Sequence, residues 1–122
     1  FSYMEKAGLI GQLRSATKGI RGLGKVDKVY LDNTNLAFSL ADDPPDLGNL
    51  RETFFYNQMR NKNDVFSSDK GDFTIGKYSF EIGGKNKKHT QLETGAGSFW
   101  VKDDSEHAYR NVIPLWHFGM NY

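Results

Sequence analysis

Two acidic residues, Asp72 and Glu81, lie in an otherwise apolar and turn-forming stretch, GDFTIGKYSFEIGG, which covers residues 71–84. Alternation of apolar and polar residues on both sides of Gly76 and Lys77 predicts two strands joined by a two-residue turn, with positive φ at the glycine. This register places Asp72 opposite Glu81, on the face that the apolar residues leave free. Opposed residues have Cβ atoms roughly 4.5–5.5 Å apart, so the two carboxylates are a candidate site for a divalent metal ion.

The same pair of acids has a second interpretation. Like charges that face each other across a sheet are destabilising, so their repulsion must be offset. A bound cation would offset it. Simple exposure at a sheet edge would also do so, because water screens surface charges and leaves them weakly coupled.

A third candidate acid, Glu52, belongs to a helix that the sequence predicts from Leu50 to about Arg60. Asn49, three residues earlier, fits a capping pattern in which Glu52 completes the first turn. Glu52 also shares a helical face with apolar residues such as Phe55, which would direct it toward the sheet. An inward carboxylate needs a partner, since an unpaired buried charge is strongly disfavoured.

Two basic segments are candidate binding sites. The cluster KNKKH, residues 85–89, is suited to contact phosphate groups and equally suited to a solvated turn. The segment GIRGLGK, residues 19–25, matches the first part of a P-loop, but Val26 follows where a magnesium-binding Ser or Thr is required. We interpret it as a flexible loop, which argues against a nucleotide site.

The elements that must position these residues alternate in type along the chain, which predicts an α/β or mixed α+β fold with a central mixed sheet flanked by helices. Trp100 and Trp116 lie in strand-like apolar runs and are expected in the core. In chain order, the pattern predicts a helix over 2–7, strands over 9–15 and 28–33, a short helix or turn over 34–43, the helix of Glu52, a short strand over 65–68, the hairpin, a charged and partly helical segment over 85–97, and strands over 98–104 and 112–120.

Bulk properties limit the class of protein. The chain has 122 residues, 38% of them hydrophobic, and this suits one folded domain over residues 1–122. A net charge of +1 gives no overall attraction to nucleic acid or membrane, and the absence of cysteine excludes disulfides and thiolate metal sites. The three histidines show no metal-ligand spacing. With no apolar run of about 20 residues and no signal peptide, we expect a cytoplasmic protein without a membrane partner.

Four blocks of the sequence resemble a known family. The chain, from YMEKAGLI to its end, is similar to the C-terminal domain of unknown function that follows the ATPase module in certain bacterial AAA+ ATPases. That domain is in turn similar to the PD-(D/E)xK restriction-endonuclease-like fold. The blocks that carry the resemblance are KVYLDNTNL, GNLRETFFYNQM, GDFTIGKYSFEIGGK and NVIPLWHFGMNY. Because the chain also starts at Phe1, inside a predicted helix, we expect it to be part of a longer protein whose N-terminal ATPase module is its partner.

The resemblance implies three acidic site residues and a lysine. Glu52 matches the acid of the first core helix, Asp72 the acid of the second core strand, and Glu81 the acid of the third. The family pattern places a lysine two residues after the third acid, where this chain has Gly83. On an extended strand Lys85 shares a face with residues 81 and 83, so Lys85 is the candidate for that lysine.

The implied function is metal-dependent phosphodiester chemistry. Glu52, Asp72 and Glu81 would hold Mg²⁺ or Mn²⁺, Lys85 would stabilise developing charge, and nucleic acid, such as DNA, would be the substrate or ligand. Gly83 at the lysine position favours the alternative, a degenerate nuclease fold that serves as a non-catalytic regulatory or protein-interaction module of the ATPase. A third interpretation is a structural end-cap with an apolar docking surface.

Overall fold

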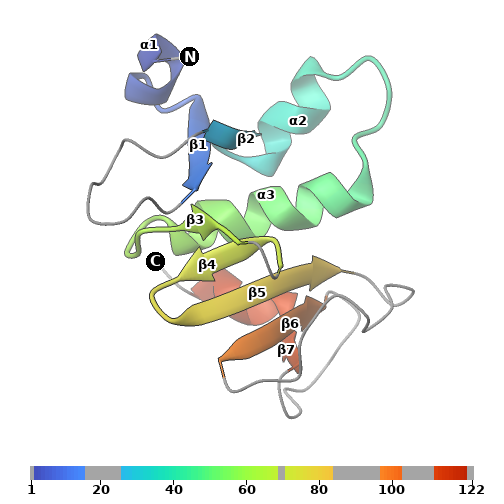
Figure 1. Cartoon of the computed structure of the whole chain (residues 1–122). Helices are drawn as coiled ribbons and strands as arrows, with labels where there is room; N and C mark the ends of the chain where they lie inside the picture. The colour runs from blue at the N-terminus through green and yellow to red at the C-terminus, as the bar shows by residue number, and fades with distance from the viewer. Residues whose placement is uncertain (1, 16–25, 69–70, 84–96, 103–111, 121–122) are drawn as a thin grey trace.

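The computed structural model describes residues 2–15, 26–68, 71–83, 97–102 and 112–120, which form one mixed sheet with helices packed on it (Figure 1). The helices are α1 (Ser2–Lys6), α2 (Thr34–Leu40), α3 (Leu47–Met59) and the 3-10 helix η2 (Leu115–Met120). The strands are β1 (Ile10–Ser15), β2 (Val26–Leu31), β3 (Phe66–Ser67), β4 (Phe73–Ile75), β5 (Tyr78–Gly83), β6 (Ser98–Lys102) and β7 (Val112–Pro114).

The sheet has seven strands in the order β2-β1-β3-β4-β5-β6-β7. The pairs β1–β3, β5–β6 and β6–β7 are parallel, whereas β1–β2, β3–β4 and β4–β5 are antiparallel. The predicted fold class, a mixed α+β fold with a mixed sheet flanked by helices, is therefore confirmed. Within the described ranges, none of the helices has the length and apolar character that crossing a bilayer requires.

Helix α3 begins three residues earlier than predicted. The carboxylate of Asp46 accepts a hydrogen bond from the backbone N–H of Asn49 at 3.0 Å, so Asp46 is the N-cap and the helix starts at Leu47. The sequence contains two residues suited to a cap, and the earlier one is used. The expected cap formed by Asn49 and Glu52 is wrong, which leaves the Glu52 side chain available for other contacts.

The hairpin of β4 and β5 has the predicted register. Its three paired positions are Phe73 with Phe80, Thr74 with Ser79, and Ile75 with Tyr78. Gly76 adopts a φ of 59° at the first turn position, as the two-residue turn requires.

Aromatic rings fill the space between the sheet and its helices. The ring of Phe55, on α3, lies 5.2 Å from the rings of both Phe73 and Phe80, centroid to centroid. Phe118, on η2, approaches Phe55 at 4.9 Å. Helices α3 and η2 therefore cover the same face of the sheet, and Figure 1 shows them on one side of it.

The end of the described chain differs from the prediction. The expected strand over 112–120 ends at Pro114, and the following residues form η2. Proline has no backbone N–H to donate, which favours the end of the ladder at this point. Trp100 is 1% exposed, as expected for a core residue, but Trp116 is 56% exposed, so its predicted burial is wrong.

Candidate functional site

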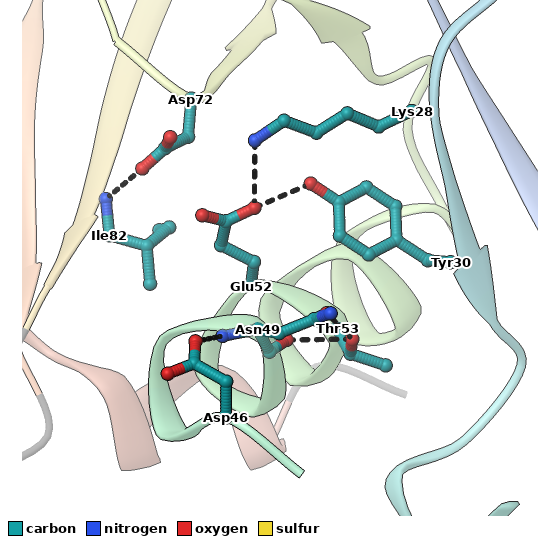
Figure 2. A network of polar contacts seen from close by, with 8 residues as sticks. All are labelled: Lys28, Tyr30, Asp46, Asn49, Glu52, Thr53, Asp72 and Ile82. Carbon is teal, nitrogen blue, oxygen red and sulfur yellow. Dashed lines mark hydrogen bonds and ion pairs between the residues drawn. The ribbon is translucent and has the colours of Figure 1, made fainter. Parts of the chain in front are cut away.

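The Glu52 side chain points from α3 toward strand β2 rather than back to the helix N-terminus (Figure 2). Its Oε2 oxygen accepts a hydrogen bond from the Lys28 ammonium group at 3.0 Å and another from the Tyr30 hydroxyl at 2.7 Å. The inward-pointing carboxylate of Glu52 is therefore paired with a cation and a neutral donor. These two contacts offset the cost of desolvating the carboxylate.

Strand β2 positions both donors. Lys28 and Tyr30 are two residues apart, so their side chains lie on the same face of the strand. Tyr30 is buried, and its ring lies 5.0 Å from that of Tyr56, a neighbour on α3. The Lys28 side chain is 48% exposed and that of Glu52 is 19% exposed, so the ion pair lies at the boundary between the core and solvent.

Asp72 lies just before β4, where the regular ladder ends. Its backbone N–H donates to the carbonyl oxygen of Phe80 at 2.9 Å, and its Oδ2 oxygen accepts the backbone N–H of Ile82 at 2.8 Å. The Asp72 carboxylate thus replaces a main-chain acceptor at the edge of the pairing. These two bonds tie Asp72 to residues 80 and 82 of β5 and fix the direction of its carboxylate.

Glu52 and Asp72 face the same space. Figure 2 shows the Glu52 carboxylate between Asp72 on one side and the Lys28 and Tyr30 donors on the other. Burial raises the pKa of Tyr30 most, and the hydrogen bond to Glu52 and the negative charges of Glu52 and Asp72 raise it further. Both acids are therefore close enough to act electrostatically on one hydroxyl group, which stays protonated and remains a donor.

The Glu81 side chain projects from the face of the sheet opposite to the one that α3 covers. It alternates with Phe80 and Ile82, whose side chains belong to the core under α3, so the Glu81 side chain starts on the opposite face. Glu81 is only 5% exposed, and its Oε2 oxygen lies 3.3 Å from the position that a Cβ atom would occupy at Gly71.

The remaining predicted site features are placed only in part. Gly83 is the last residue of β5 and pairs with Lys102 of β6. Lys85, with the whole KNKKH cluster, lies outside the described residues, as does the 19–25 loop. Among the residues that are described, no group of three or more Asp, Glu or His side chains is arranged to hold a metal ion. The metal therefore stays a prediction.

A pocket of about 390 Å³ opens beside the Glu52 cluster. One wall carries Lys28 and Tyr30 from β2, and the other carries the first turn of α3 with Glu52. Asp46 also lines the pocket, and its carboxylate is engaged as the helix cap. The pocket therefore presents an ammonium group and a carboxylate side by side, an arrangement that can receive a phosphate group together with a cation.

Lys28 and Tyr30 are the site residues that the sequence analysis did not identify. Period-two alternation in KVYLDN does place them on one face of a strand. The missing information was which helix lies opposite that face, because β2 and α3 meet only through the tertiary fold.

Comparisons with known proteins give no assignment. No protein-family model matches the chain, and searches of curated proteins and of solved structures find no match either.

Proposed function

We propose that this chain is a nuclease-like domain of an AAA+ family ATPase, in which Glu52 and Asp72 bind Mg²⁺ or Mn²⁺ next to a phosphate group of nucleic acid. The observation that supports this proposal is the convergence of the two carboxylates, from separate elements, toward one space (Figure 2), with Glu52 also lining an open pocket. Two carboxylates that face the same space repel each other, and a bound divalent cation would offset that repulsion.

The ligand chemistry fits a magnesium-type ion. Mg²⁺ is commonly bound through one or two carboxylates, several waters and the phosphates of the substrate. Glu52 Oε2 is held by Lys28 and Tyr30, and Oε1 has no hydrogen-bond partner in the described part of the chain. A bound ion would polarise a phosphodiester oxygen and lower the pKa of a bound water.

The protein residues then have distinct tasks. The Ile82 amide fixes the Asp72 carboxylate, and the protonated Tyr30 hydroxyl fixes that of Glu52. Such preorganisation reduces the cost of ordering the ligands when the ion binds.

Titration with Mn²⁺, followed by calorimetry, tests the proposal. Glu52→Gln and Asp72→Asn each keep the shape of the side chain but remove a negative ligand, so we expect about a tenfold or greater loss of affinity from each. Asp43→Asn, an exposed acid outside the cluster, is the matched control and leaves the affinity unchanged. Equal affinities in all four proteins would contradict the proposal.

Activity is measured separately with single-stranded DNA, double-stranded DNA and RNA in the presence of Mn²⁺. Cleavage by the wild type that Asp72→Asn and Glu52→Gln both abolish supports a nuclease. Glu81→Ala tests the third acid that the resemblance implies.

The second candidate is a non-catalytic regulatory or protein-interaction module of the ATPase. Two observations favour it. Glu52 is already neutralised by Lys28, and Glu81 leaves its strand on the face opposite the core that contains Phe80 and Ile82. Absence of Mn²⁺ binding in the wild type would select this candidate over the nuclease.

A further inference from the structure

Lys28 provides the ammonium group at the candidate site. Its amine is hydrogen-bonded to one of the predicted site acids, at 3.0 Å from Glu52 Oε2. About half of its side chain is exposed, and it lines the adjacent pocket, so the same amine can reach a ligand there.

The position at which the resemblance predicts a lysine cannot supply one. Gly83 has no side chain, and its neighbour across the sheet, Lys102, is engaged elsewhere. The Lys102 amine lies over the Trp100 ring, 4.1 Å from its centroid. Trp100 pairs with Glu81, and both leave their strands on the face opposite the core cluster of Ile82 and Val101. Lys102 is therefore directed away from the Glu52 cluster.

We propose that Lys28, on strand β2, supplies the lysine of this site. In the metal-free protein its ammonium group balances the charge of Glu52. A divalent ion bound by Glu52 would weaken this ion pair, and the Lys28 ammonium group would then be able to contact a phosphate of a bound nucleic-acid strand. This inference rests on the proposed function and adds a residue from a strand that the family pattern does not include.

The geometry sets the expected size of each effect. A metal ion on the Glu52 carboxylate and the Lys28 ammonium group are both attracted to the same negative charge and repel each other, and partly exposed ion pairs are weak. Removing the ammonium group therefore strengthens Mn²⁺ binding by about two- to fivefold. Loss of one phosphate contact weakens nucleic-acid binding by about tenfold and reduces the salt slope for a single strand by about 0.7.

The test compares Lys28→Met with a matched lysine variant, Lys77→Met, on the turn between β4 and β5. Mn²⁺ affinity is measured by calorimetry. Affinity for a single-stranded oligonucleotide is measured by fluorescence anisotropy at several salt concentrations, with Ca²⁺ as the oxygen-binding cation. We expect Lys28→Met to shift the two affinities in opposite directions and Lys77→Met to shift neither. Lys28→Arg, which keeps the positive charge, should recover oligonucleotide binding.

The outcomes separate the two proposals. If the wild type binds Mn²⁺ and Asp72→Asn loses it, while Lys28→Met leaves both affinities unchanged, the role of Lys28 is overturned and the metal site stands. If Lys85→Met weakens oligonucleotide binding and Lys28→Met does not, Lys85 is the lysine of the site and the inference is wrong. If the wild type binds no Mn²⁺, the proposed function fails and this inference fails with it.

Discussion

At the scale of single residues, Tyr30 connects the candidate site to the stability of the fold. Its hydroxyl group donates to Glu52, while its ring packs among Tyr56 and Phe73 at centroid distances of 5.0 and 5.8 Å. Burial and the neighbouring acids raise its pKa above the ordinary tyrosine value. Burial raises the pKa of Tyr56 as well, against the opposing effect of Arg60.

The raised pKa of Tyr30 predicts a loss of stability in alkali. An unfolded chain gives up a tyrosine proton above about pH 10, whereas the folded protein keeps it. Below about pH 10, Tyr30 therefore gives the free energy of unfolding no pH dependence. Above about pH 10 it makes that free energy fall, by up to about 1.4 kcal/mol per pH unit.

Urea unfolding between pH 7 and pH 11.5 measures this dependence. Tyr30→Phe lacks the hydrogen bond to Glu52 and should be less stable at pH 7 by about 1–3 kcal/mol, with a shallower decline above pH 10. Tyr3→Phe, at an exposed position, is the control and should follow the wild type. A Tyr30→Phe curve parallel to that of the wild type above pH 10 would contradict the assignment.

Whether a residue of the candidate site can be predicted from the sequence depends on how local its sequence signal is. Asp72 is a candidate from the sequence because strand alternation and turn chemistry are local, and the predicted pairs up to Phe73 and Phe80 are confirmed. The bonds from Asp72 to residues 80 and 82 were not predicted. A side chain that accepts a hydrogen bond from a backbone N–H of the neighbouring strand produces no periodic pattern in the sequence. Lys28 was missed because its partner lies 24 positions away in the sequence.

At the scale of elements, the strongest predictions concerned those with local signals. Strands β1, β2 and β6 and helix α1 lie where periodicity and glycine positions placed them, within about two residues. The short helix or turn predicted over 34–43 is the helix α2, which ends three residues earlier, at Leu40. The start of α3 was wrong because two neighbouring residues, Asp46 and Asn49, are both good caps. The strand predicted over 112–120 was wrong after Pro114. The segment LWHFGM is apolar enough for a strand, and its 3-10 conformation is selected by its packing, which the sequence pattern does not show.

The 3-10 helix η2 and a strand in the same place would differ in how deeply they bury Trp116 and Phe118. In a strand, Trp116 and Phe118 would share one face and have similar burial. In η2, Phe118 contacts the rings of Phe55 and Phe80, at 4.9 and 6.4 Å between centroids, while Trp116 is exposed.

Thermal or urea unfolding of two alanine variants distinguishes these arrangements. Phe118→Ala should lower the free energy of unfolding by about 2–4 kcal/mol, because it removes a ring from the aromatic core. Trp116→Ala should change it by less than about 1 kcal/mol. Comparable losses in the two variants would favour the strand.

At the scale of the whole molecule, the order of the strands brings the site together. Strand β2 is at the edge of the sheet, separated from β4 by β1 and β3. Lys28 of β2 nevertheless bonds to Glu52, and Asp72, just before β4, is close enough to act electrostatically on Tyr30. The Glu52 side chain, on α3, lies between Asp72 and the two donors of β2 (Figure 2). The sequence predicted a mixed sheet but gave no strand order, since the parallel pairing of β1 with β3 joins segments about 50 residues apart.

A metal ion that bridges α3 and the approach to β4 would stabilise the folded protein as a unit. An ion that binds only the folded state, at 100 times its dissociation constant, contributes about 2.7 kcal/mol. For a domain of this size we expect the Tm to rise by on the order of 10 °C. Differential scanning calorimetry with and without Mn²⁺ measures the shift, and Asp72→Asn should remove it. A Tm that rises equally in that variant would place the ion elsewhere.

The bond from the Ile82 amide to Asp72 affects how mutants at this position must be interpreted. Alanine at position 72 would leave the amide without its oxygen acceptor, so any defect would reflect a damaged sheet as much as a lost ligand. Asparagine keeps the oxygen and gives up the charge, and so separates the two roles. The same reasoning applies over evolutionary time. Selection for a stable sheet would keep an oxygen acceptor at position 72 for the Ile82 amide, with or without a metal ion.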